Sequence, residues 1–117
     1  MQVRRIIANV VARDPSAVDE FYRRVLGLAL AMDHGWIRTY AGDEPMTVQV
    51  SIASEGGAGT PVPALSVEVD DLDEALRRVR EADIPVEYGP VIEPWGVRRF
   101  YVRDPVGTLV NILQHVG

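Results

Sequence analysis

The sequence predicts an α+β fold made of two βαβββ modules. An aspartate that begins a helix after an apolar run occurs twice, at Asp14 and Asp71, about half of the 117-residue chain apart. A period this long indicates a duplicated supersecondary unit. In both halves the hydrophobic spacing changes from strand-like to helical and back to strand-like. Two such modules are expected to face each other across a pseudo-twofold axis, so that equivalent strands of both build a cleft.

Composition and charge restrict the class of protein. The length suits one domain with a single core, here a domain spanning residues 1–117. Acidic residues number 17 and basic residues 12, so the net charge of −5 disfavours a nucleic-acid partner. The absence of cysteine excludes disulfides, thiol nucleophiles and thiolate metal sites. No signal peptide and no run of about 20 apolar residues is present, so we expect a cytoplasmic protein without a membrane partner.

The first module is predicted to occupy residues 1–54. An Ile- and Val-rich strand should precede Asp14, which caps a helix with Pro15 in its first position. Val18 and Tyr22 belong to the apolar stripe of this helix, and Gly27 should stop it. The expected elements are strands at 3–12, 28–32, 36–40 and 46–53 and a helix at 14–25.

The second module is predicted at residues 64–117, after a Gly- and Pro-rich linker at 55–63. Asp71 should cap its helix, and Glu74 stands three residues later, in the position of a capping box. The apolar stripe of this helix is expected at Leu72, Ala75, Leu76 and Val79. The expected strands are 64–69, 86–92, 97–103 and 108–115.

Three segments resemble the vicinal oxygen chelate superfamily, which includes glyoxalase I, bleomycin-resistance proteins and extradiol dioxygenases. They are FYRRVLGL at 21–28, VEVDDLD at 67–73 and FYVRDPVGTL at 100–109. The three segments occur in this order at the spacing of the repeat, and the resemblance covers essentially the whole chain. The resemblance implies a curved mixed sheet around a concave cleft, which is the glyoxalase/bleomycin-resistance fold. It also implies a small-molecule ligand and a homodimer, but it leaves the activity open because this fold carries unrelated chemistries.

Strand alternation predicts which side chains face the cleft. One face of the sheet is consistently apolar, with Ile6, Ala8 and Val10 on the first strand, and should be covered by the two helices. The other face is polar, and it is either the cleft wall or a solvated sheet face. The candidate ligand-binding residues are Trp36, Arg38, Tyr40, Gln49, Glu68, Trp95, Arg99, Tyr101 and Asn111.

The positions that correspond to metal ligands in metal-bearing relatives do not carry metal-binding side chains here. The resemblance maps them to Ile7, Gln49, Ala64 and Asn111, which are two aliphatic residues and two amides. Zinc, nickel and iron prefer imidazole, carboxylate or thiolate ligands. His34 is expected in an exposed turn and His115 at a frayed strand end. We therefore predict no metal and no other cofactor.

Glu68 is the weak candidate for a catalytic residue. It is the only carboxylate on the cleft face of the central strands, where it could act as a general acid or base. The competing interpretation is a structural salt bridge to Arg99 or Arg38. Trp36 and Trp95 could stack on a flat or cationic ligand, or could pack at the core edge or a subunit interface. Arg98 and Arg99 could bind a ligand carboxylate, or pair with Glu93 and Asp104.

Three hypotheses for the function follow. The first is a metal-independent small-molecule binding protein, with drug sequestration as one version. The second is an enzyme: a metal-dependent lyase, isomerase or dioxygenase resembling glyoxalase I, or a metal-free enzyme that uses Glu68 as its base. The third is a module whose dimer surface is its function.

Overall fold

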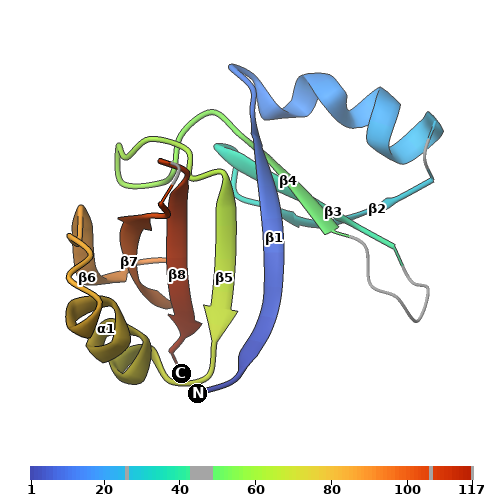
Figure 1. Ribbon diagram of the computed structural model, residues 1–117. Coiled ribbons are helices and arrows are strands. Elements are labelled where there is room, and N and C mark those ends of the chain that lie inside the picture. The colour runs from blue at the N-terminus through green and yellow to red at the C-terminus, as the bar shows by residue number, and fades with distance from the viewer. Residues whose placement is uncertain (26, 43–48, 106, 117) are drawn as a thin grey trace. The chain divides into compact units, whose positions relative to one another are not determined.

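The computed structural model describes residues 1–25, 27–42, 49–105 and 107–116. Their strands belong to one sheet in the order β2-β3-β4-β1-β5-β8-β7-β6 (Figure 1). The predicted order βαβββ–βαβββ is confirmed. The elements are β1 (Val3–Val11), η1 (Pro15–Val18), η2 (Glu20–Val25), β2 (Ala29–Asp33), β3 (Ile37–Ala41), β4 (Gln49–Ala53), β5 (Leu65–Val69), α1 (Leu72–Glu81), β6 (Tyr88–Glu93), β7 (Val97–Arg103) and β8 (Leu109–His115).

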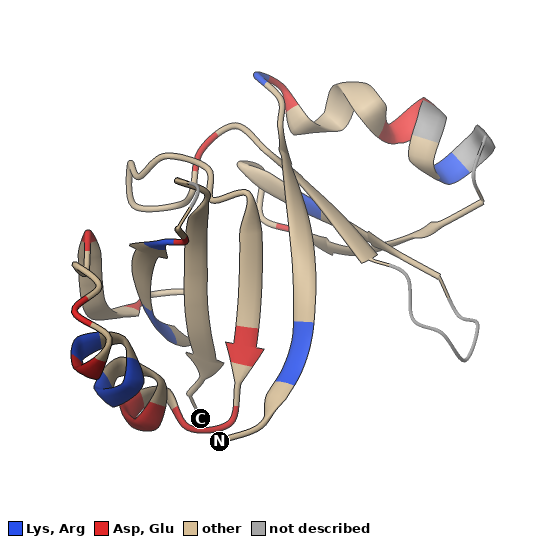
Figure 2. Cartoon of the chain, viewed as in Figure 1, with Lys and Arg blue, Asp and Glu red and all other residues tan. Residues whose placement is uncertain are grey.

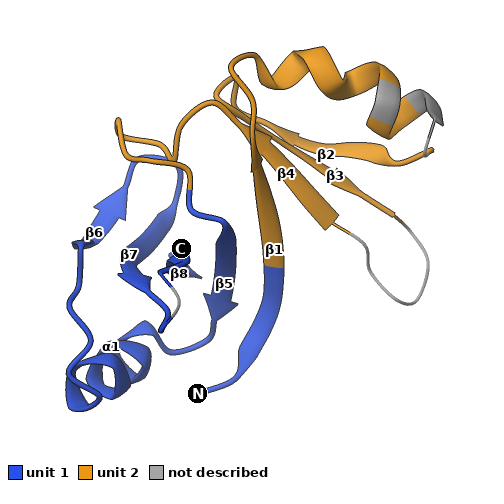
Figure 3. Cartoon of the chain, turned by 45° about the horizontal axis from the view of Figure 1, so that its top comes forward, with its two compact units in different colours: residues 1–6, 63–117 blue, residues 7–62 orange. Residues whose placement is uncertain are grey.

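The chain divides into two compact units, coloured blue and orange in Figure 3. One comprises Met1–Ile6 and Pro63–Gly117, and the other comprises Ile7–Val62. The repeat assigns the first six residues to the first module, but they pack with the second half of the chain. The reason is a pair of hydrogen bonds: Asp70 N donates to Gln2 O over 3.1 Å, and Gln2 N donates to Asp70 Oδ1 over 2.7 Å.

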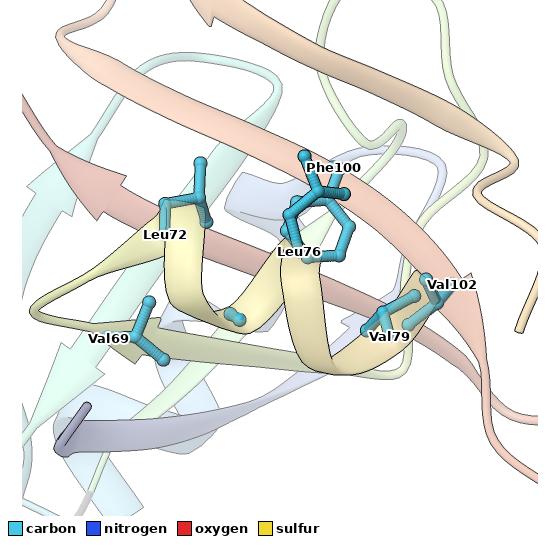
Figure 4. Packing of buried hydrophobic residues seen from close by; sticks show 7 residues of the cluster. Val69, Leu72, Leu76, Val79, Phe100 and Val102 are labelled. Atoms are coloured by element: carbon cyan, nitrogen blue, oxygen red, sulfur yellow. The ribbon is translucent and has the colours of Figure 1, made fainter. Parts of the chain in front are cut away.

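In the unit that contains residues 63–117, β5 runs parallel to β8, and β7 lies antiparallel between β8 and β6. Helix α1 begins at Asp71, whose Oδ1 accepts a hydrogen bond from Glu74 N over 3.1 Å. The predicted stripe Leu72, Ala75, Leu76 and Val79 is buried against Val69, Phe100 and Val102 (Figure 4). Full burial of each large aliphatic side chain contributes about 1.5–3 kcal/mol, which makes this cluster the main stabilising contact of the unit.

The outer surface of α1 carries charges of both signs (Figure 2). Arg77 bonds to Glu74 and to Glu81, and Arg78 also reaches Glu74. The hydrogen bonds from Arg77 and Arg78 lower the pKa of Glu74 to about 2. These ion pairs are exposed to solvent. They keep the outer side of the helix polar, and they contribute little to its stability.

In the unit 7–62, β1 runs parallel to β4, and β3 lies antiparallel between β4 and β2. The predicted cap at Asp14 is confirmed, because its Oδ1 accepts hydrogen bonds from Ser16 N and Ser16 Oγ. The expected regular helix over 14–25 is wrong in detail: a 3₁₀ turn is followed by wide π turns. Leu28 N donates to Tyr22 O over 3.0 Å around Gly27, whose φ of +71° suits the predicted stop.

One prediction about the sheet faces is wrong for β1. Ile6 and Val10 were expected beneath the helices, but they are 60% and 45% exposed. The helices cover other strands, since α1 packs on β5, β7 and β8 while η1 contacts β3 and β4. The predicted strand residues 46–48 lie outside the described part of the chain. None of the helices in the described residues has the length and apolar character needed to cross a membrane.

Candidate functional site

The candidate site lies on the side of β5, β7 and β8 that faces away from α1, here called the polar face. Residues paired directly across strands point to the same side of a sheet. Asn111 pairs with both Ser66 and Tyr101, and Leu113 pairs with both Glu68 and Arg99. Four predicted site residues, Glu68, Arg99, Tyr101 and Asn111, therefore share this face. Trp95, from the turn between β6 and β7, joins them through Arg99.

Arg99 is the centre of an aromatic cluster on the polar face. Its guanidinium carbon lies 4.9 Å from the ring centroid of Tyr101, 5.0 Å from that of Trp95 and 5.4 Å from that of Tyr88. Its Nη2 and Nε bond to Glu93 Oε2 over 2.7 and 3.0 Å, and its Nη1 donates to Tyr101 OH over 2.9 Å. The guanidinium is thus held by a carboxylate and three rings, all from this unit.

The ion pair at the centre of this cluster is buried, so both charges have lost their contact with water. The side chains of Arg99 and Glu93 are 3% and 4% exposed. Two charges removed from water stay stable only when each is paired and hydrogen-bonded. Tyr88 OH supplies a further bond to Glu93, at 3.2 Å from both carboxylate oxygens. Of the two alternatives left open for Arg99, the structure shows the pairing with Glu93, so Arg99 is not the partner of Glu68.

Glu68 is engaged by two other residues on the polar face. Its Oε1 lies 2.5 Å from Arg5 Nε, and its Oε2 lies 2.9 Å from His115 Nδ1. Burial acts to raise the pKa of Glu68, but hydrogen bonds from His115 and Arg5 outweigh it and hold that pKa below its ordinary value. The competing interpretation of Glu68 as part of a structural salt bridge therefore fits the structure, but the expected partners Arg99 and Arg38 were wrong.

His115 was also misjudged, because β8 runs through it and pairs it with Val97. It is part of an ordered strand rather than a frayed end. The signal was present in the sequence, since His115 shares the face of Asn111 by alternation. What the sequence lacked was the register between β5 and β8, which sets Glu68 against Leu113 and so places it one diagonal step from His115.

Asn111 is 7% exposed, and its amide is only half satisfied. Its Nδ2 donates to Ser66 Oγ over 3.2 Å. Its Oδ1 is buried and has no hydrogen-bond partner among the residues that the structure describes. An unpaired buried acceptor costs about 1–3 kcal/mol, so Asn111 is a strained point of this face.

Two predicted site residues on β3 face the other way. Arg38 pairs with Ile52 and Tyr40 with Val50, which puts both on the apolar side of the sheet. There Arg38 Nη1 and Tyr40 OH both donate to Asp19 Oδ1, over 3.1 and 3.0 Å. The expectation that they line the cleft is wrong, because the alternation of this strand was read in the opposite phase.

The opposite side of β3 and β4 carries a small polar group. Thr39 Oγ1 and Ser51 Oγ are 2.7 Å apart and buried, and Gln49 lies on the same side and is half-buried. Trp36 precedes β3, and its ring stacks at 6.3 Å on His34, which is exposed in its turn as predicted. Thr39 was missed because a threonine in a strand carries no functional signal by itself.

The residues at the positions that the family resemblance maps to metal ligands are poor donors for a metal ion. Ile7 belongs to the buried hydrophobic residues, and Ala64 carries no donor atom. Asn111 and Gln49 offer only neutral amides, and the Asn111 Nδ2 is bonded to Ser66. Across the described ranges 1–25, 27–42, 49–105 and 107–116, no three His, Cys, Asp or Glu side chains gather as a metal site.

Comparison with known proteins supports the fold. The sequence profile described as the Glyoxalase/Bleomycin resistance protein/Dioxygenase superfamily matches residues 6–112. No curated protein sequence matches the chain significantly. A structure titled NAD-dependent benzaldehyde dehydrogenase from Legionella pneumophila is similar, with 14% identity and a TM-score of 0.76 over 95% of this chain and 99% of that one.

Two further solved structures are similar. A glyoxalase/bleomycin resistance protein/dioxygenase superfamily member from Vibrio splendidus 12B01 has 18% identity and a TM-score of 0.66, over 97% of this chain and 99% of that one. Methylmalonyl-CoA epimerase from Mycobacterium tuberculosis has 19% identity and a TM-score of 0.66, over 95% and 87%. At these identities the likeness concerns the fold alone.

Proposed function

Because the chain belongs to the glyoxalase/bleomycin resistance protein/dioxygenase superfamily, we propose that it is a small-molecule binding protein that works without the metal of its metal-bearing relatives. The observation that carries the proposal is the set of side chains at the four metal-ligand positions, Ile7, Gln49, Ala64 and Asn111. Neither an aliphatic side chain nor a neutral amide competes with imidazole or carboxylate for a transition ion. Recognition then depends on hydrogen bonds, stacking and shape.

The charges of the polar face support an uncharged ligand. Arg99 is neutralised by Glu93 within the protein, and Arg5 by Glu68. A charged ligand would have to compete with these pairs, whereas an uncharged one leaves them intact. Drug sequestration is one version of this function. The proposed ligand-contact residues in the unit that contains residues 63–117 are Glu68, Trp95, Arg99, Tyr101 and Asn111. Trp36 and Gln49 are proposed separately, as contact residues of the unit 7–62.

We also propose that the protein acts as a homodimer that uses β1. This strand exposes four apolar side chains, with Val3 50%, Ile6 60%, Val10 45% and Val11 70% exposed. By alternation Ile6 and Val10 lie on one side of this strand, here called the apolar strip, and Val3 and Val11 lie on the other. Exposed apolar side chains gathered in this way are typical of an interaction surface. Dimers are also what the family resemblance implies, so a second copy of the chain is the proposed partner.

Two measurements test the proposed function on protein purified without added metal. Elemental analysis should give far less than one zinc, nickel, iron or manganese ion per chain, and adding these ions should leave the melting temperature equal to that of a chelator-treated control. In a melting-temperature screen, a small-molecule ligand should raise the melting temperature, because a ligand at 100 times its Kd adds about 2.7 kcal/mol to the free energy of unfolding. A stoichiometric ion that raises the melting temperature would contradict the proposal and favour a metal-dependent lyase, isomerase or dioxygenase.

A further inference from the structure

We propose that His115, oriented by Glu68, is a proton-accepting subsite for an uncharged ring compound that carries a weakly acidic hydroxyl. The inference deepens the proposed function and rests on it, because it names the ligand chemistry of the polar face. It uses three residues from three strands of one unit: Arg5 on β1, Glu68 on β5 and His115 on β8.

The first step is the state of the imidazole. An ionised carboxylate only accepts hydrogen bonds, so the contact of 2.9 Å between Glu68 Oε2 and His115 Nδ1 requires the proton on Nδ1. Arg5 holds the other carboxylate oxygen and thereby fixes the orientation of Glu68. In the neutral ring, Nε2 is then the atom with the lone pair, and it is the acceptor available to a ligand.

The second step is access. The side chain of His115 is 53% exposed, whereas that of Glu68 behind it is 16% exposed. Glu68 is therefore shielded while the ring reaches solvent. Within the described part of the chain, Nδ1 to Glu68 is the polar contact of this ring, and Nε2 has no partner. A half-exposed base supported by a shielded carboxylate is the arrangement that general acid–base catalysts use.

The third step is the chemistry of the neighbours. Leu113, two residues before His115 on the same side of β8, is half-buried and lies between Glu68 and Arg99 in the ladder. Beside the Glu68–Arg5 pair, the surface next to the imidazole thus includes apolar Leu113, and the partly exposed rings of Trp95 and Tyr88 belong to the Arg99 cluster beyond it. Apolar and aromatic surface beside one proton acceptor favours a flat, uncharged ring with a single hydroxyl.

The proposed step is a balanced proton transfer. The ligand O–H bond breaks, its electron pair stays on the oxygen, and an N–H bond forms at Nε2. The products are an oxyanion and an imidazolium whose Nδ1–H faces the Glu68 carboxylate. No oxidant, reductant or other reactant is consumed, and the step is reversible.

The test uses 4-nitrophenol, because its neutral and ionised forms absorb at different wavelengths. The full-length protein is added to the probe at a pH where most of the free probe is protonated. We expect a saturable rise in the band of the ionised form. His115→Gln should weaken this response about tenfold or more, which is the scale of losing one hydrogen bond to a charged group. His34→Gln removes the exposed turn histidine and should leave the response unchanged.

Glu68→Gln tests the positioning role. A glutamine oxygen still accepts from Nδ1–H but carries no charge, so we expect the ionised fraction of the bound probe to fall without complete loss of binding. Nitrogen NMR of the two histidines should show the Nδ1–H tautomer for His115 in the free protein. Circular dichroism of each variant shows whether it is folded.

The inference is overturned if His115→Gln folds and ionises the probe as well as the unchanged protein, or if His115 is the Nε2–H tautomer. These failures are distinguishable from failure of the proposed function. If the protein is metal-free and binds other screened compounds but does not ionise 4-nitrophenol, the proposed function is retained and the subsite is rejected. If the protein contains a stoichiometric ion and still ionises the probe after the ion is removed, the proposed function is rejected but the subsite is retained.

Discussion

At the scale of single residues, Arg99 shows how strongly one buried charge depends on its surroundings. Its guanidinium sits among three aromatic rings and is paired with Glu93, and both side chains are almost completely buried. Such a pair adds little net stability compared with apolar residues of the same shape, but loss of one partner leaves a charge without compensation. The cluster is therefore sensitive to single substitutions.

Glu93→Gln should lower the free energy of unfolding by about 3–5 kcal/mol, because it leaves the Arg99 charge buried and unpaired. Urea denaturation followed by circular dichroism measures the loss. The matched control is Arg98→Gln, which breaks the pair with Asp73, a side chain that is 79% exposed. That change should cost less than about 1 kcal/mol, as expected for a surface pair. Equal losses in the two variants would contradict the role assigned to burial.

The residue contacts could be predicted only where alternation or neighbouring charges in the sequence determine them. The pairing of Arg99 with Glu93 was among the alternatives left open, because the two lie close in the sequence across one turn. The partners of Glu68 were not, because Arg5 and His115 come from opposite ends of the chain and meet through sheet register. Arg38 and Tyr40 were placed on the wrong side, since a short strand with mixed residues does not reveal its phase.

At the scale of elements, β6 contains a position that only glycine can occupy. Gly89 has a φ of +77°, and a Cβ there would lie 2.5 Å from Arg99 O and 3.0 Å from Val91 N. Both atoms belong to the backbone, which cannot move aside without disturbing the β6–β7 pairing. Gly89 therefore allows the close approach that brings Tyr88 to the Arg99 cluster.

Gly89→Ala should destabilise the protein by about 1–3 kcal/mol more than Gly59→Ala, as an added methyl group in a packed site does. Gly59 has a similar φ of +75° but nothing within 4 Å of the position of a Cβ. Both variants incur the cost of a left-handed alanine, so their difference isolates the steric clash. Thermal and urea unfolding provide the comparison, and a difference near zero would refute the close approach.

Asp71→Ala should cost about 1 kcal/mol in the free energy of unfolding, because the side chain caps α1 at Glu74 N. Asp71→Asn keeps an acceptor oxygen at the same place and should come within a few tenths of a kcal/mol of the unchanged protein. Urea denaturation curves of both variants test this. If the asparagine variant loses as much as the alanine variant, the negative charge rather than the cap is responsible.

The order of elements was predictable, because strand and helix periodicities are local and both helix caps are marked by aspartate. β7 has the predicted bounds, 97–103, and the apolar stripe of α1 packs as expected. The wide turns of η2 were not predictable, because the apolar spacing of this segment is that of an α-helix and carries no sign of π turns. The exposure of Ile6 and Val10 on β1 was not predicted, because it depends on which strands the helices pack against, and local sequence does not determine that.

At the scale of the whole molecule, we expect stability to fall on acidification through Glu68 and Asp70. A hydrogen bond from Gln2 N lowers the pKa of Asp70, and bonds from His115 and Arg5 lower that of Glu68 against the effect of burial. A lowered pKa contributes stability that is present above the unfolded-state values of 3.8 and 4.5 and is lost as the pH falls through the folded-state values.

The measurement is the urea midpoint between pH 7 and pH 3. The double variant Glu68→Gln, Asp70→Asn should be less stable at pH 7 but lose less on acidification. Asp73→Asn, which removes a 79% exposed carboxylate, controls for the loss of charge alone. Parallel curves for the double variant and the unchanged protein would show that these carboxylates do not carry the pH dependence.

Ile6→Glu should convert the proposed dimer to a monomer, because it puts a charge into the apolar strip of β1. Size-exclusion chromatography with light scattering gives the mass directly. Ile92→Glu is the matched control, since Ile92 is 68% exposed on β6 and lies outside that strip. A monomeric unchanged protein, or equal effects of the two variants, would reject β1 as the interface.

The duplicated pattern was enough to predict the two-module architecture, because a half-chain repeat of strands and helices restricts the fold to few topologies. The family was suggested separately, by the resemblance of three sequence segments. The duplicated pattern was not enough to predict the compact units. A repeat places the first residues in the first module, whereas hydrogen bonds to Asp70 hold them in the second unit.

The packing of residues 1–6 with the second half of the chain has a consequence for biosynthesis. Residues 1–6 are synthesised before Asp70, so their hydrogen bonds to it cannot form until translation has passed that residue. A polypeptide cut at the linker would give a carboxyl-terminal piece that lacks residues 1–6, and a short synthetic peptide of that sequence should restore its stability in trans. The carboxyl-terminal copy of the repeat would then be incomplete on its own, although it contains its own strands and helix.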